Sequence, residues 1–137
     1  MPTLVDTSAL YALADANAAE HGRVRSYVQT SRDLLVLPVT VLPEADYLIA
    51  TRLGQRVAAA LLRSVVAGEF VVETLERSDL SRCLELMAAY ADTPIGLVDA
   101  SIVAIAERLH VSQILTLDRR HFSMFQPRHV QAFTLLP

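Results

Sequence analysis

Four acidic residues of the 137-residue chain could do chemistry together, because each stands where a predicted strand ends or a predicted helix begins. Asp6 follows the apolar run TLV, and Asp118 follows the run ILTL. Glu44 and Asp99 lie in the first turns of helices predicted over residues 40–53 and 97–109. In an open parallel sheet, ligands bind beyond the carboxyl ends of the strands, so these four positions border one crevice if the two aspartate strands are neighbours.

Oxygen ligands of this kind select hard cations such as Mg²⁺ or Mn²⁺. A cation held there would activate water and stabilise the charge of an in-line displacement, which makes a phosphodiester the natural substrate. Each acid also has a plain structural explanation. Asp6, Glu44 and Asp99 could serve as helix caps or favourable charges at helix N-termini, and Asp118 could be a turn residue. Asp92, in YADTPIG, competes with Asp99 for the third position but is more typical of a loop.

Short β-type runs alternate with helical patterns along the chain, which predicts a mainly parallel sheet. The three most apolar runs are typical of strands covered on both faces. The fold class we expect is α/β, a three-layer α/β/α sandwich, formed by one domain over residues 1–137. The strands are expected at 3–5, 34–37, 70–73, 114–117 and within 131–136, and the helices at 8–14, 17–30, 40–53, 55–67, 78–90 and 97–109.

Composition excludes several classes of protein. All 12 basic residues are arginine, so no lysine can act as a base, form a Schiff base or serve a phosphate-binding loop. Haloacid-dehalogenase-like phosphotransferases usually need a lysine, and they need a second acid where this chain has Ser8. Cys83 is the only cysteine, and its helical context predicts a small core residue, so a zinc site is not expected. No apolar run approaches the roughly 18 residues of a membrane span, and we expect a cytoplasmic protein.

The segments VDTSAL, LPEADYL, LVDASIVAIAERL and ILTLDRRHF, in that order, resemble the PIN-domain ribonucleases across essentially the whole chain. The chain length is similar to that of the VapC-type toxins of bacterial toxin–antitoxin pairs. The resemblance implies a Mg²⁺-dependent endoribonuclease, with Mn²⁺ as a substitute, that cleaves structured RNA such as transfer or ribosomal RNA. Its catalytic acids would be Asp6, Glu44, Asp99 and Asp118, with Asp6, Asp99 and Asp118 holding the metal.

Other polar residues near these acids are candidates for supporting roles. The resemblance points to Ser8 near the first aspartate, where its hydroxyl would hold a carboxylate or a bound water, although a helix cap explains it equally well. Thr116 lies two residues before Asp118, on the same side of its strand, and is a weaker candidate for the same role. Arg119, Arg120 and His121 could contact RNA phosphates, or could form a solvated loop.

The resemblance also implies two protein partners. A cognate antitoxin would cover an apolar surface and could insert a basic side chain into the acidic site, and a homodimer is expected within the larger complex. The high apolar content, 53% of residues, fits such surfaces. The alternative is a binding or assembly module without catalysis, in which the acids serve only as caps and turns. That alternative predicts that Mg²⁺ changes nothing.

Overall fold

The structure is a computed structural model that describes residues 1–137. Five strands form where the apolar runs predict them, each within a few residues of the expected bounds. They are β1 (Pro2–Val5), β2 (Leu34–Pro38), β3 (Val71–Glu73), β4 (Gln113–Leu115) and β5 (Thr134–Leu136). Seven helices connect them: α1 (Thr7–Ala14), α2 (His21–Thr30), α3 (Val41–Leu53), α4 (Gln55–Val66), α5 (Arg77–Ala89), α6 (Leu97–Leu109) and α7 (Arg119–Met124).

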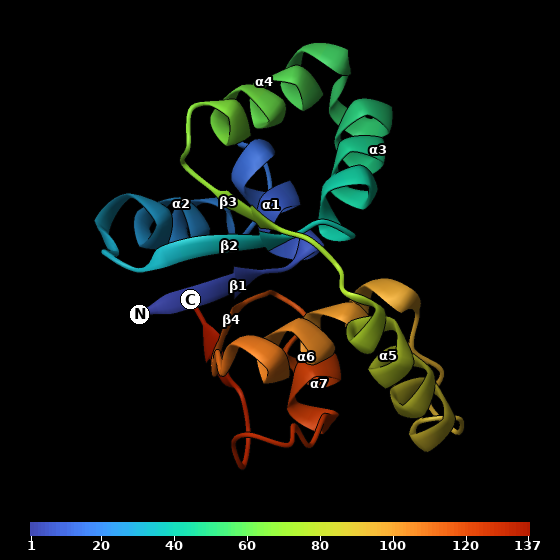
Figure 1. The fold of residues 1–137 in the computed structure, drawn as a ribbon. Coiled ribbons are helices and arrows are strands. Elements are labelled where there is room, and N and C mark those ends of the chain that lie inside the picture. The colour runs from blue at the N-terminus through green and yellow to red at the C-terminus, as the bar shows by residue number, and fades with distance from the viewer.

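The strands form one sheet in the order β3-β2-β1-β4-β5, and every neighbouring pair is parallel. Helices α1 to α4 lie on one side of this sheet and α5 to α7 on the other, as Figure 1 shows. The predicted α/β/α sandwich is therefore confirmed, with a sheet that is entirely parallel. None of the helices is both long and apolar enough to cross a membrane.

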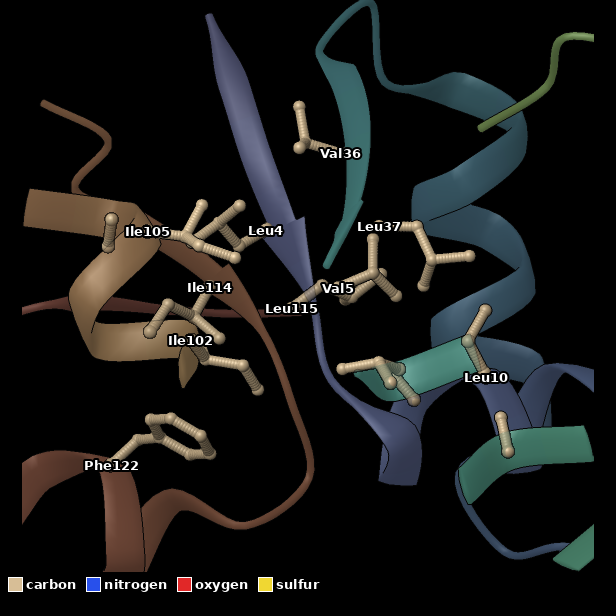
Figure 2. Close-up of a cluster of buried hydrophobic side chains, with 14 of the residues drawn as sticks. Leu4, Val5, Leu10, Val36, Leu37, Ile102, Ile105, Ile114, Leu115 and Phe122 are labelled. Carbon is tan, nitrogen blue, oxygen red and sulfur yellow. The ribbon is translucent and has the colours of Figure 1, made fainter. Parts of the chain in front are cut away.

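The core lies on both faces of the central strands (Figure 2). Leu4, Leu37 and Ile114 have no exposed surface, which explains why these strands are almost purely apolar. Helix α6 is buried at every residue from Ala100 to Ala106, so its apolar surface extends well beyond a single stripe. Small residues in this helix allow it to pack closely against the sheet and against α5. Cys83 is also buried, as predicted.

Two predicted elements differ from the structure. The helix expected over 17–30 begins only at His21, because the Asp15 carboxylate accepts the Asn17 backbone N–H at 3.0 Å and forms a turn. The segment after Asp118 forms the short helix α7, where the sequence suggested a loop. Helix α3 begins at Val41, one residue later than expected, and the hydroxyl of the preceding Thr40 bonds to the Ser101 hydroxyl at 2.6 Å and does not cap the helix.

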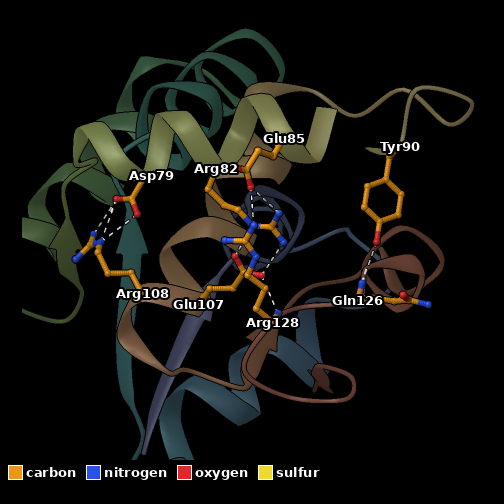
Figure 3. Close-up of polar contacts among 8 residues, drawn as sticks. All are labelled: Asp79, Arg82, Glu85, Tyr90, Glu107, Arg108, Gln126 and Arg128. Carbon is orange, nitrogen blue, oxygen red and sulfur yellow. Dashed lines mark hydrogen bonds and ion pairs between the residues drawn. The ribbon is translucent and has the colours of Figure 1, made fainter. Parts of the chain in front are cut away.

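A polar network joins α5 and α6 to the segment that follows α7 (Figure 3). Arg82 on α5 donates from Nε and Nη2 to the two carboxylate oxygens of Glu107 on α6, at 2.7 and 3.0 Å. Glu107 also accepts the backbone N–H of Arg128 at 2.8 Å. Arg108 pairs with the buried Asp79 at 3.0 Å. These charges satisfy one another, which explains how they tolerate partial burial.

Candidate active site

The site forms where β1 and β4 lie side by side at the centre of the sheet. The chain runs outward from β1 to β2 and β3, and then returns to add β4 and β5 on the other side of β1. Strand order reverses between β1 and β4, which is the position where open α/β sheets bind ligands. The Asp6 backbone N–H donates to the Leu115 carbonyl at 3.0 Å, so pairing continues to the edge of the crevice.

A pocket of about 480 Å³ opens at this edge, and all four acids predicted from the sequence line it. Asp6 comes from the end of β1, Glu44 from α3, Asp99 from the first turn of α6, and Asp118 from the start of α7. Asp92 lies in the exposed loop between α5 and α6 and does not line the pocket. The arrangement therefore favours Asp99 over Asp92 as the third acid.

Two hydroxyl groups fix the Asp6 carboxylate. Thr116 Oγ1 donates to Asp6 Oδ2 at 2.7 Å, and Ser8 Oγ donates to the same oxygen at 3.1 Å. The hydroxyls are themselves held, since the Asp118 backbone N–H donates to Thr116 Oγ1 and the Leu117 backbone N–H donates to Ser8 Oγ, each at 3.0 Å. Residues from β1, α1 and the end of β4 thus orient one buried carboxylate.

The same acids also cap helices. Asp6 Oδ1 accepts the Thr7 backbone N–H at 2.8 Å at the start of α1, and Asp118 Oδ1 accepts the His121 backbone N–H at 3.1 Å at the start of α7. Asp6 and Asp118 can therefore cap a helix with one oxygen and still be available as ligands through the other. Capping uses one oxygen of each carboxylate and fixes its direction, while the other oxygen is turned to different partners.

His121 lies between two of the acids. Its Nδ1 atom is 2.9 Å from Asp99 Oδ2 and 3.3 Å from Asp118 Oδ2. The imidazole can donate a proton to only one carboxylate at a time through this nitrogen, so the two acids share one donor. His121 is therefore directed at the carboxylates, whereas the sequence suggested a contact with RNA phosphates.

Burial and repulsion between carboxylates raise the pKa of two of these acids, Asp6 and Asp99. Burial raises the pKa of Asp6 above its usual value, and the nearby charge of Asp118 adds to the rise, although hydrogen bonds from Thr116 and Ser8 oppose it. Burial and the charge of Asp6 raise the pKa of Asp99 from 3.8 to about 6. Negative charge in the pocket is thus only partly compensated by protein groups.

Glu44 is exposed, as is Asp118, but it differs from the other acids because it has no hydrogen-bond or ion-pair partner in the structure. Helical spacing puts Glu44 close to Val41 and Ala45 on α3, where an acid would be costly to bury. The structure avoids this cost. Val41 and Ala45 point into the core, while Glu44 faces the pocket and keeps its contact with water.

The donor set fits a hard divalent cation. Five carboxylate side chains line the pocket, and a bound cation would relieve the repulsion that, together with burial, raises the pKa of Asp99. No three Asp, Glu, His or Cys side chains lie close enough together to form a ready-made metal site. Mg²⁺ matches such an open arrangement, because it keeps several waters and needs few direct carboxylate ligands.

The two arginines of α7 do not line the pocket. Arg119 Nη2 donates to the Pro137 carbonyl at 2.6 Å, and Arg120 is exposed without a side-chain partner. Sequence reasoning also missed Tyr11 on α1, Arg52 on α3 and a fifth acid, Glu20, which precedes α2; all three line the pocket. The spacing of Arg52 was a usable signal, because Glu44, Leu48 and Arg52 recur every four residues and so share one face of α3.

Comparison with known proteins identifies the family to which this α/β fold with its acidic pocket belongs. Residues 3–125 match the PIN domain, and the chain belongs to the PIN-domain family. It is 37% identical to Ribonuclease VapC26 of Mycobacterium tuberculosis over 134 residues, which cover 98% of this chain and 99% of the relative.

Two solved structures share the fold. Mycobacterium tuberculosis VapC20, described as a sarcin-ricin loop cleaving toxin, matches with a TM-score of 0.80 and 22% identity over 85% of this chain and 90% of its own. A toxin–antitoxin complex from Klebsiella pneumoniae matches with a TM-score of 0.65 and 18% identity, over 90% and 92% of the two chains. The match to the PIN domain and the 37% identity to Ribonuclease VapC26 confirm the predicted resemblance to the PIN-domain family, and the solved structures agree in fold.

Proposed function

We propose that this protein is a Mg²⁺-dependent endoribonuclease toxin of the VapC type, with Mn²⁺ as a substitute metal, acting as one domain in the cytoplasm. The observation that carries the proposal is that Asp6, Glu44, Asp99 and Asp118 line one pocket at the reversal of strand order. The 37% identity to a ribonuclease over nearly the full chain supports the same activity. The substrate we propose is a structured RNA, either a transfer RNA or a loop of ribosomal RNA.

In this proposal Asp6, Asp99 and Asp118 hold the metal. When bound, the cation supplies a Lewis acid that activates water and stabilises charge on the scissile phosphate. Asp6 enters the reaction already oriented by Thr116 and Ser8, so its ligand geometry does not depend on loop motion. Glu44, which has no protein partner, takes up the proton released by the attacking water.

The test is cleavage of labelled total RNA by purified protein with Mg²⁺, with Mn²⁺ and with chelator. We expect discrete fragments carrying a 5′-phosphate that require metal and disappear in Asp6→Asn and Asp99→Asn. Asp92→Asn is the matched control, because it removes an exposed loop carboxylate outside the pocket and should cleave normally. Fragments ending in 2′,3′-cyclic phosphate, or cleavage that survives chelation, would contradict the mechanism.

We further propose that a cognate antitoxin inhibits the enzyme. An apolar cavity of about 300 Å³ between α1, α2, α3 and α4 offers a surface for it, lined by Leu10, Leu13, Ala14, Val28, Ile49, Val57, Ala60, Leu61, Ser64, Glu69 and Phe70. The Klebsiella structure, a toxin–antitoxin complex that contains a chain of this fold, supports such a partner. Co-expression of the candidate antitoxin should suppress cleavage, and Val57→Asp in the cavity should restore it.

A homodimer is the remaining partner that we propose. Several large apolar side chains are exposed on the helices, among them Tyr47 and Leu84, and contact with a second copy would remove them from water. Sedimentation equilibrium of the purified protein should therefore give twice the mass of 15.0 kDa. A monomer at micromolar concentration would contradict this part of the proposal.

A further inference from the structure

The pocket contains one basic residue among its fourteen lining residues, Arg52, against five acids. An RNA phosphate approaching this pocket meets negative charge from most directions, so a positive group at the rim has a strong influence on how the strand enters. The chain as a whole carries a net charge of -3 and offers no general attraction for RNA. Binding must therefore depend on local arginines.

Arg52 is held in place without being neutralised. Its guanidinium carbon lies 5.4 Å from the centroid of the Tyr11 ring, within the range of a cation–π contact. This contact between α1 and α3 orients a long side chain that would otherwise sample many rotamers. No carboxylate lies within ion-pair distance of Arg52, and no protein acceptor takes its N–H groups. Its planar fork of donors is therefore free to bind a phosphate.

Other arginines are less suited to this role. Arg23, Arg82, Arg108 and Arg128 are already paired with carboxylates. Among the arginines without a carboxylate partner, only Arg52 lines the pocket that holds the acids. Arg119 and Arg120 lie on α7, and so on the opposite side of the sheet from α3 (Figure 1).

The distance along α3 indicates which phosphate Arg52 can reach. Glu44 and Arg52 are eight residues apart on the same face, which corresponds to about 12 Å along the helix axis. A phosphate at Arg52 is therefore a different one from the phosphate at the carboxylates. Leu48 lies between them and lines the same pocket, so the wall from Glu44 to Arg52 is continuous.

We propose that Arg52, oriented by Tyr11, binds a non-scissile phosphate of the RNA and sets the direction in which the strand crosses the pocket. This inference rests on the proposed ribonuclease function and adds a substrate-binding residue and a positioning residue to it. Because Arg52 contacts RNA away from the reacting bond, it stabilises bound substrate and transition state alike. Its loss should raise KM and leave kcat nearly unchanged.

The experiment measures binding without cleavage. Asp6→Asn protein is titrated into a fluorescein-labelled RNA hairpin, and anisotropy gives Kd at several salt concentrations. Adding Arg52→Ala should weaken binding roughly tenfold and reduce the slope of log K against log salt by about 1, as expected for one lost phosphate contact. Arg63→Ala is the matched control, because Arg63 is also an exposed, unpaired arginine in the last turn of its helix but lies outside the pocket.

Variants of Tyr11 and Arg52 separate charge from orientation. Tyr11→Phe keeps the aromatic face and should bind RNA normally, whereas Tyr11→Leu should weaken binding by releasing Arg52. Arg52→Lys keeps the charge but not the planar fork, and should restore binding only in part. Circular dichroism of each variant shows whether the fold is intact.

The results distinguish this inference from the proposed function. Equal Kd values and salt slopes for Arg52→Ala and Arg63→Ala would overturn the role of Arg52, even if the acids prove essential for cleavage. Absence of RNA binding by the Asp6→Asn protein would also overturn it. Loss of binding in Arg52→Ala, combined with no metal-dependent cleavage by the unaltered protein, would keep the phosphate contact and reject the nuclease.

Discussion

The imidazole of His121 lies against the carboxylate of Asp99, with Nδ1 and Oδ2 separated by 2.9 Å. The same nitrogen is 3.3 Å from Asp118 Oδ2. His121 thus lies between two carboxylates that we propose as metal ligands, and it would compete with a bound cation for their oxygens. Replacing His121 should lower the melting temperature of the metal-free protein and should increase the rise in melting temperature that Mg²⁺ produces.

His121→Ala should lower the melting temperature in chelator by roughly 3 °C, since both carboxylates lose their shared donor and about 1 kcal/mol of hydrogen bonding. Mg²⁺ should then raise the melting temperature of the variant more than that of the unaltered protein, because no side chain competes for the ligands. Differential scanning fluorimetry over a Mg²⁺ series measures both effects. Arg120→Ala, in the same helix and without a side-chain partner, is the control. An identical Mg²⁺ response in all three proteins would contradict the idea of competition.

Asp99→Asn should stabilise the metal-free protein at neutral pH. The pKa of Asp99 rises from 3.8 to about 6 on folding, so the ionised carboxylate is disfavoured in the native state. Its unfavourable contribution is absent below about pH 4, grows as pH rises to about 6, and is complete above that pH. Because 23% of the side chain is exposed, we expect a gain of about 1 kcal/mol at pH 7.

Urea unfolding of Asp99→Asn in chelator at pH 4 and pH 7 measures this effect. The gain in the free energy of unfolding should be present at pH 7 and vanish at pH 4. Asp92→Asn, in an exposed loop, should change stability at neither pH. A gain of equal size at both pH values would show that relief of ionisation is not its cause.

Thr116→Val should reduce cleavage by about 10- to 100-fold while keeping the fold, since it removes the hydroxyl that orients Asp6 at 2.7 Å. The buried Asp6 carboxylate loses one donor and the Asp118 backbone N–H loses its acceptor, so unfolding should become easier by about 1 to 2 kcal/mol. Single-turnover cleavage and urea unfolding measure the two effects. Thr116→Ser retains the hydroxyl and should recover most of the activity; a serine variant as inactive as the valine variant would point to a packing role.

Arg82→Ala should destabilise the protein far more than Arg128→Ala. The Arg82 side chain is 17% exposed and pairs with Glu107, which is 9% exposed, so its removal leaves a buried charge at a cost of about 3 kcal/mol. Arg128 and its partner Glu85 are 63% and 55% exposed, and their ion pair contributes about 0.5 kcal/mol at most. Urea unfolding of the two variants makes the comparison, and similar losses in both would contradict the ranking by burial.

The sequence predicted the sheet and the four pocket acids for a simple physical reason. Buried parallel strands are short and almost purely apolar, so an acid that ends such a run, as Asp6 and Asp118 do, stands out. Glu44 and Asp99 follow from the same argument, because first turns of helices also face the carboxyl edge of the sheet. Local patterns are enough to place residues at an edge.

Contacts between distant segments could not be predicted in this way. The position of His121 depends on α7, which has six residues and too little periodicity to be recognised. The contact of Arg52 with Tyr11 depends on how α1 and α3 pack, and no local sequence pattern around either residue predicts that contact. The turn at Asp15 depends on one side-chain hydrogen bond, and the helical periodicity over residues 17–30 cannot predict such a bond.

The position of β1 at the centre of the sheet affects when activity can arise during synthesis. Asp6 and its first hydroxyl partner, Ser8, are made early, but the second hydroxyl partner, Thr116, lies 110 residues after Asp6 in the chain. Long-range contacts of this kind form late, after the intervening segment has been made and packed. If the protein is the ribonuclease proposed above, a growing chain still on the ribosome would carry an unassembled site and would not cleave the RNA around it until nearly all of its residues had emerged.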